Sequence, residues 1–254
     1  MFTEKHPKWF QTYLDTIDVK SMYPTRFYNA LKLILDVELE KAMDDLKEYV
    51  AESPDKLRQE IGWTYIGHLH MMEGRFKDAE TAYRESIARG MKTQDSNWGL
   101  YISLIKQGEL DEARKLKGEH QVSTTDAALM LKVMQAAPLM MGGNFAQAEK
   151  IFADIILKFE SGNLAVHQWM ILGNGYGAEE MLDYAQFGFT MGILSFPIYS
   201  NPWNLLALCY RDQGKEHLFN KTKKMASDLL ELGLSGNISV DNPNGIDLTS
   251  LMDM

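Results

Sequence analysis

The sequence predicts an all-α protein, a solenoid of stacked antiparallel helix pairs, because short segments recur at the spacing of a helix pair. Three glycines are separated by 34 and then 35 residues. In each case an apolar residue follows the glycine by two positions, and an alanine follows three positions later. A period of roughly 20–50 residues indicates a repeat architecture. The glycines are Gly74, Gly108 and Gly143, and the alanine series runs through Ala42, Ala79, Ala113, Ala148 and Ala185.

Each repeat is predicted to contain a helix, a tight turn at the glycine and a second helix. Small alanines let the two helices approach closely, and aromatic side chains fill the space beside them. One helix pair alone cannot bury its apolar face, so neighbouring pairs must stack. Trp169 and Trp203, also 34 residues apart, extend the same period towards the C-terminus.

Two of the repeats resemble the consensus of the tetratricopeptide repeat (TPR) family. The better copy departs from the consensus at Gly192, where an alanine is usual, and the other copy has His70 in place of a tyrosine. The resemblance implies a right-handed superhelical solenoid. The matching residues are Trp169, Leu172, Gly173, Tyr176, Ala185, Phe189 and Pro197 in one copy, and Trp63, Ile66, Gly67, Gly74, Phe76, Ala79 and Tyr83 in the other.

The repeats divide the chain into three expected parts. Residues 1–22 are predicted to form an N-terminal capping segment, and residues 23–233 the solenoid, with about five repeats and a degenerate C-terminal cap. Pro138 lies within the first helix expected for the third repeat and should kink or shorten it. Residues 234–254 are predicted to be a flexible tail, which either stays untethered or docks in a partner or in the chain's own groove.

Charge and composition argue against several classes of partner. The formal net charge is -9, and no run of Lys and Arg is present, which disfavours a nucleic-acid binder. No apolar stretch has the length of a membrane span, and the N-terminus lacks the apolar run of a secretory signal. Cys209 is the only cysteine, which fits a reducing compartment. We therefore expect a cytoplasmic protein that does not insert into membranes.

Three segments that could carry chemistry have simpler explanations. The glycines of residues 172–177 resemble those of a phosphate-binding loop, but the repeat register places them inside a helix. His68 and His70 are two residues apart, and helical metal ligands need a spacing of three or four. Cys209 lies among leucines, as a buried inert thiol does. We expect no catalytic residue, no metal and no cofactor, and hence not an enzyme.

The TPR resemblance implies that the first helix of each pair lines a concave groove. At the corresponding positions this chain is apolar and rich in methionine, a flexible side chain that suits grooves for varied apolar segments. The same residues fit core packing, or a groove closed by the protein's own ends. The expected groove residues are Thr64, His68, Met71, Met72, Trp98, Ile102, Ile105, Met130, Val133, Met140, Met141, His167, Met170 and Asn174.

Two functions follow from this groove and its alternatives. The first is an adaptor or chaperone that binds an apolar peptide segment of a partner protein in the groove. A chaperone that acts in secretion is one form of this hypothesis. The cationic clamp with which heat-shock co-chaperones of the TPR family hold a carboxylate is absent, because Thr64, His68, Gly99, Met130 and Met134 occupy its positions. The second is a structural assembly subunit that forms homo-oligomers through convex or end surfaces.

Overall fold

Helices are the regular secondary structure of the described part of the computed structural model. That part comprises residues 25–89, 94–119 and 182–235, with scattered positions at 139, 147, 151, 169–170, 173–174, 177, 238, 240–241 and 243. No strand occurs in these segments, which confirms the predicted all-α class. The helices are α3 (Thr25–Leu35), α4 (Leu39–Glu52), α5 (Lys56–Met72), α6 (Phe76–Ala88), α7 (Gln94–Gln107), α8 (Leu110–Glu119), α12 (Leu182–Ser195), α13 (Ser200–Asp212) and α14 (Glu216–Glu231).

Contacts within the chain divide it into two compact units. One unit joins residues 23–121 to two later segments, 196–201 and 224–254, and contains α3 to α8. The other joins residues 1–22, 122–195 and 202–223, and contains α12 and most of α13. The boundaries expected from the sequence, at residues 22 and 233, stay a prediction.

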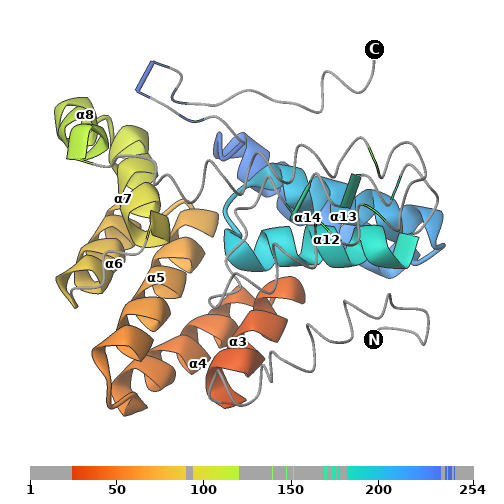
Figure 1. Cartoon of the computed structure of the whole chain (residues 1–254), viewed down its shortest axis with the longest axis horizontal. Helices are drawn as coiled ribbons and strands as arrows, with labels where there is room; N and C mark the ends of the chain where they lie inside the picture. Colours follow the sequence, from red (N-terminus) through yellow and green to blue (C-terminus); the bar gives the residue numbers. More distant parts are fainter. Residues whose placement is uncertain are drawn as a thin grey trace. The chain divides into compact units, whose positions relative to one another are not determined.

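Helices α3 to α8 follow one another as neighbours, each connected to the next by a short segment (Figure 1). Every consecutive pair in this series is in contact, and α5 also contacts α7. The contact between α5 and α7 joins the first helices of two successive pairs, as stacking of helix pairs requires.

The turns between paired helices repeat one geometry. Gly74, Gly108 and Gly214 each have a positive φ, of 72°, 81° and 68°. Each donates its backbone N–H to the carbonyl three residues earlier, and the following residue bonds to the carbonyl five residues earlier. This pair of hydrogen bonds ends a helix with a left-handed residue, for which glycine is the least strained choice. The two repeat glycines that the structure describes therefore lie in turns, as the sequence predicts.

The alanines of the repeat lie at the centre of the packing. Ala42, Ala79, Ala113 and Ala185 are all 0% exposed. Each is in the second helix of its pair, where a larger side chain would separate the helices. The fifth member of the series, Ala148, and the turn glycine Gly143 lie outside the described residues, as does Pro138.

Candidate functional site

The ring of Tyr83 on α6 fixes the spacing between α5 and α7. A Cβ atom added to Gly67 on α5 would lie 2.6 Å from the ring carbon Cε1 of Tyr83. One added to Gly99 on α7 would lie 2.3 Å from its carbon Cζ. Because non-bonded carbons do not approach so closely, only glycine fits at either position. The ring thus packs against the bare backbone of two first helices at once.

The same contact recurs in the other unit. Phe189 on α12 lies sixteen residues after Gly173, as Tyr83 lies sixteen residues after Gly67. A Cβ atom added to Gly173 would be 2.5 Å from carbon Cε1 of Phe189. The glycine of one helix and the aromatic ring of the next therefore form a repeated unit of packing. The fold is TPR-like.

Comparisons with known proteins add little to this assignment. No protein-family model matches the chain, and no curated protein matches it. It is similar to the solved structure of MamA MSR-1, with 16% identity, 68% of this chain and 97% of that chain covered, and a TM-score of 0.34. It is also similar to YrrB, a TPR protein with an unusual peptide-binding site, with 13% identity. That match covers 87% of this chain and 91% of that chain, with a TM-score of 0.33.

A tetratricopeptide repeat protein from Parabacteroides merdae ATCC 43184 is similar at 14% identity, with 89% of this chain and 84% of that chain covered and a TM-score of 0.35. TM-scores of this size carry no argument about function. The TPR-like assignment therefore depends on the glycine turns, the buried alanines and the glycine–aromatic contacts of this chain itself.

The expected groove residues differ widely in exposure. Trp98 and Asn174 are exposed, and Met170 is half-buried. The other described groove residues are buried and in this conformation present no surface to a partner. Thr64, His68, Met71, Met72, Ile102 and Ile105 are buried, whereas Met130, Val133, Met140, Met141 and His167 lie outside the described residues.

His68 is an aromatic core residue of its unit. Its Nδ1 atom is 2.8 Å from the hydroxyl oxygen of Tyr83, and its ring centroid is 4.8 Å from that of Phe196. Burial lowers the pKa of His68 to about 3, so the ring is neutral at physiological pH. Its Nε2 atom is buried, and no hydrogen-bond partner reaches it within the described part of the chain. His68 supports the α5 face by packing.

Trp98 is the exposed centre of an aromatic group on α7. Its ring stacks on Tyr101, with centroids 4.9 Å apart and planes inclined at 26°. Its indole N–H donates to the hydroxyl of Tyr199, whose ring lies 5.0 Å from that of Phe196. Trp98 itself is 36% exposed. We call Trp98, Tyr101, Phe196 and Tyr199 the α7 aromatic cluster.

The sequence identified only Trp98 of this cluster. Tyr101 lies three residues after Trp98, so the helical spacing alone could have indicated it. Phe196 and Tyr199 come from a segment about one hundred residues away, and no local signal links them to α7.

Burial also raises the pKa of a carboxyl group in the first turn of α7. Asp95 has a pKa of about 6 because it is desolvated. Burial is the main cause of the raised pKa values of Tyr83 and Tyr199, and the negative charge of Asp95 raises both further. Both tyrosines therefore keep their hydroxyl protons, and they act as hydrogen-bonding groups at neutral pH.

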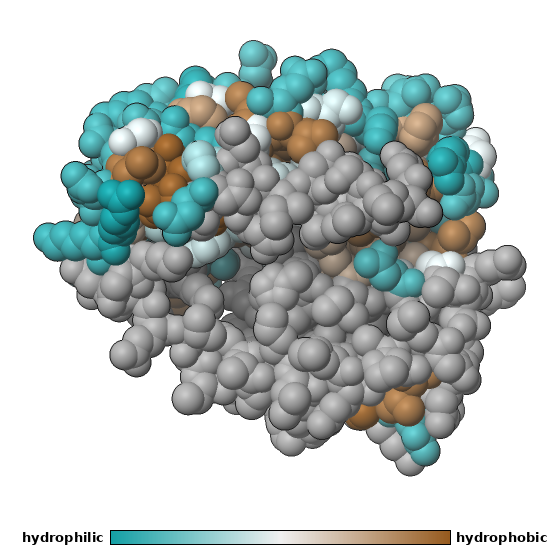
Figure 2. Space-filling view, turned by 90° about the horizontal axis from the view of Figure 1, so that it is seen from above, coloured by the Kyte–Doolittle hydropathy of each residue, from teal (hydrophilic) through white to brown (hydrophobic). Residues whose placement is uncertain are grey.

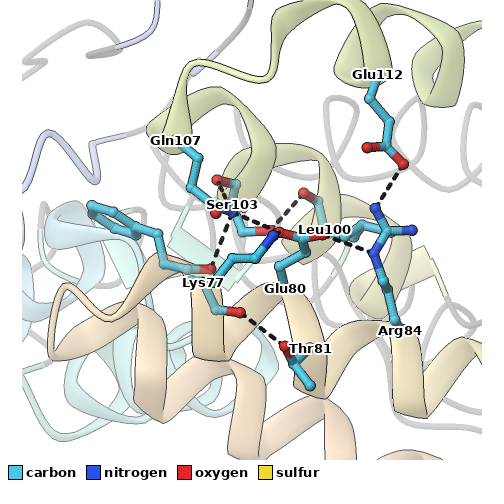
Figure 3. Close-up of polar contacts among 9 residues, drawn as sticks. Lys77, Glu80, Thr81, Arg84, Leu100, Ser103, Gln107 and Glu112 are labelled. Atoms are coloured by element: carbon cyan, nitrogen blue, oxygen red, sulfur yellow. Dashed lines mark hydrogen bonds and ion pairs between the residues drawn. The ribbon is translucent and has the colours of Figure 1, made fainter.

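A charged network on α6 joins two helix pairs (Figure 3). The carboxylate of Glu80 accepts hydrogen bonds from Lys77 at 2.8 Å, Arg84 at 2.9 Å and Gln107 at 3.0 Å. Burial alone would raise the pKa of Glu80, but these three donors lower it to about 2. Arg84 continues to Glu112 on α8 at 2.6 Å. Since both carboxylate oxygens of Glu80 have a donor, this network stabilises the packing of α6 against α7 and α8.

The other groups with possible chemistry have environments that suit packing. Burial, and then the charge of Asp212, raise the pKa of the buried Cys209 thiol to about 12. Among the described residues, no cluster of three His, Cys, Asp or Glu side chains could hold a metal ion. None of the described helices combines the length and apolar character needed to cross a membrane.

Exposed hydrophobic surface in the described part is scattered. In the space-filling view, hydrophobic residues appear at several separate places among the coloured residues (Figure 2). The exposed large hydrophobic side chains are Leu57, Trp98, Leu218 and Leu230.

Proposed function

We propose that the chain is a non-catalytic protein-interaction module that binds a peptide segment of a partner against the α7 aromatic cluster. The observation that carries the proposal is the exposed ring of Trp98, held by Tyr101 and Tyr199 at a position that the TPR resemblance assigns to the groove. The five groove residues outside the described part belong to the same proposal, as does the methionine-rich character of the groove.

The cluster favours a peptide with an apolar side chain. A tryptophan that is fixed by a stack and a hydrogen bond loses little conformational entropy when it binds. Its ring offers a flat apolar contact to a side chain of a bound segment. Such a site fits an adaptor or chaperone role, including one in secretion. The proposal places the protein in the cytoplasm.

Selection of displayed peptides tests this proposal. Random twelve-residue peptides on phage are selected on the full chain, and their affinities are then measured for wild type, Trp98→Ala and Leu57→Ala. Leu57 is a matched control because it is also an exposed large apolar residue, on α5. We expect Trp98→Ala to weaken the selected peptides by more than about tenfold, the loss of a hot-spot residue. Equal losses in the two variants, or none in either, would contradict the proposal.

The second candidate is an assembly subunit that acts by self-association. It is favoured by the exposed leucines Leu218 and Leu230 on α14, the helix expected to cap the repeats. Light scattering after gel filtration, at several concentrations, measures the mass in solution. A mass that rises with concentration in wild type and not in Leu218→Ser/Leu230→Ser supports this candidate, and a constant monomer mass contradicts it.

A further inference from the structure

The end of the chain returns to α7. The backbone N–H of Val240 donates to the hydroxyl of Tyr101 at 3.2 Å, and Lys106 donates from its Nζ atom to the carbonyl of Pro243 at 2.7 Å. Ile238 is only 1% exposed, whereas Asp241 and Pro243 are exposed. All these residues belong to the same compact unit as α7. We call residues 238–243 the return segment, of which the structure describes Ile238, Val240, Asp241 and Pro243.

The chain is turned into this position just after α14. Gly233 has φ 66°, and Leu234 donates its N–H to the carbonyl of Leu229, which closes the helix end. The carbonyl of Leu234 then accepts the backbone N–H of Ser200 at 2.9 Å. The chain four residues before the return segment is therefore hydrogen-bonded to residues 196–201, the segment that supplies Tyr199 to the α7 aromatic cluster.

Both contacts of α7 with the return segment are to main-chain groups. A hydroxyl accepts a peptide N–H, and an ammonium donates to a peptide carbonyl. Contacts of this type do not read side chains, so the backbone of another peptide can satisfy them equally well. Val240 precedes Pro243 as Tyr101 precedes Lys106, so the segment runs in the same direction as the helix.

The return segment also uses the residue next to the proposed binding position. Tyr101 accepts the Val240 N–H with its hydroxyl while its ring stacks on Trp98. Burial lowers the pKa of Lys106, as expected for an ammonium partly removed from water. A partner peptide that contacted Trp98 and Tyr101 would meet the return segment at the same hydroxyl.

We propose that residues 238–243 are an intramolecular ligand of α7, which a partner peptide must displace. This inference rests on the proposed function, since it concerns the same face of α7. Release of this segment breaks the two hydrogen bonds to α7 and leaves the hydrogen bonds within the helices in place. A segment bound about 90% of the time lowers the apparent affinity for a competing peptide about tenfold.

The test uses the full chain and a variant that releases the segment. Ile238→Glu places a charge at the buried position of the return segment, and Asp241→Asn is the matched control at an exposed position three residues later in the same segment. Hydrogen exchange of the Val240 amide reports release. We expect that Ile238→Glu speeds this exchange more than tenfold, leaves α5 and α6 amides unchanged, and that Asp241→Asn behaves as wild type.

The binding probe is a labelled synthetic peptide with the sequence of residues 236–247, GNISVDNPNGID. It should bind Ile238→Glu at least about tenfold more tightly than wild type, in which the site is occupied. Tyr101→Phe in the Ile238→Glu background removes the hydroxyl that accepts the Val240 N–H but keeps the ring, and it should weaken that binding.

Two results would overturn the inference. One is a Val240 amide that exchanges equally fast in wild type and Ile238→Glu. The other is a probe peptide that binds the two proteins with equal affinity or not at all. If the selected peptides depend on Trp98 but bind wild type and Ile238→Glu with equal affinity, the proposed function stands. Only the intramolecular ligand then fails. If no selected peptide depends on Trp98, the proposed function itself fails.

Discussion

The ring of Tyr83 lies so close to Gly67 that a Cβ atom on the glycine would come within 2.6 Å of it. The same ring meets Gly99 on the next first helix, and its hydroxyl bonds to His68. One side chain thus determines how near α5 and α7 lie to each other. The position of Trp98, one residue before Gly99, depends on this contact.

Gly67→Ala and Gly99→Ala should each destabilise the chain by about 1–3 kcal/mol, because the added methyl group overpacks the Tyr83 ring. Unfolding in urea, followed by circular dichroism, measures the loss. Gly177→Ala is the control, since its Cβ would be 3.8 Å from the nearest side-chain atom, an ordinary contact. It should leave stability unchanged or raise it by up to about 1 kcal/mol through helix propensity. Equal effects of all three substitutions would contradict the packing described for Tyr83.

Val37 occupies the turn between α3 and α4 with φ 53°, in the same left-handed conformation that glycines adopt in the later turns. Val37 donates its N–H to the carbonyl of Ile34 and Glu38 donates to that of Leu33, the same two hydrogen bonds as in the glycine turns. A β-branched residue is strained there. Val37→Gly should therefore raise the free energy of unfolding by up to about 1 kcal/mol, which a higher urea midpoint would show. A lower midpoint would mean that the half-buried valine contributes more by packing than it costs by strain.

Glu80 should make stability depend on acid. Its folded pKa of about 2 lies below its ordinary value near 4.5, so its contribution is present above about pH 4.5 and is lost as the pH falls towards 2. Glu80→Gln should cost about 1–2 kcal/mol at pH 7, allowing for the exposed ends of Lys77 and Arg84, and should match wild type near pH 2. Glu112→Gln, at the exposed end of the same network, should cost much less at either pH.

The contribution of His68 to the free energy of unfolding should be lost over a higher pH range than that of Glu80. For His68, the folded pKa of about 3 lies below the ordinary value near 6.5, because burial disfavours the charged ring. Its neutral form stabilises the fold above about pH 6.5, and this contribution falls by up to about 1.4 kcal/mol per pH unit as the pH drops towards 3. His68→Gln should flatten the stability profile over that range. A nuclear magnetic resonance titration that gave His68 a pKa near 6.5 would contradict its burial.

The features that the sequence predicted correctly are those set by local geometry. A left-handed turn favours glycine wherever it occurs, and a close helix pair favours alanine, so Gly74, Gly108, Ala79 and Ala113 could be assigned from their spacing alone. The helical class and the TPR-like pairing followed from these positions.

The exposure of groove residues could not be predicted in the same way. His68 meets Phe196, Trp98 meets Tyr199, and Tyr101 meets Val240, at separations of about one hundred residues or more. Repeat offsets give the side of a helix to which a residue belongs, but not which distant segment covers it. Met71 and Ile102, both assigned to the groove, are buried, and the contact of Tyr101 with Val240 was not indicated by any repeat offset.

The indole N–H resonance of Trp98 tests the central claim most directly. In a ¹H–¹⁵N spectrum, assigned with Trp98→Phe, we predict that a selected peptide shifts this resonance while that of the fully buried Trp203 stays in place. The shift should saturate with the same dissociation constant that fluorescence anisotropy gives for the labelled peptide. A peptide that binds with that constant and leaves the Trp98 resonance unmoved would show that the α7 aromatic cluster is not the binding site.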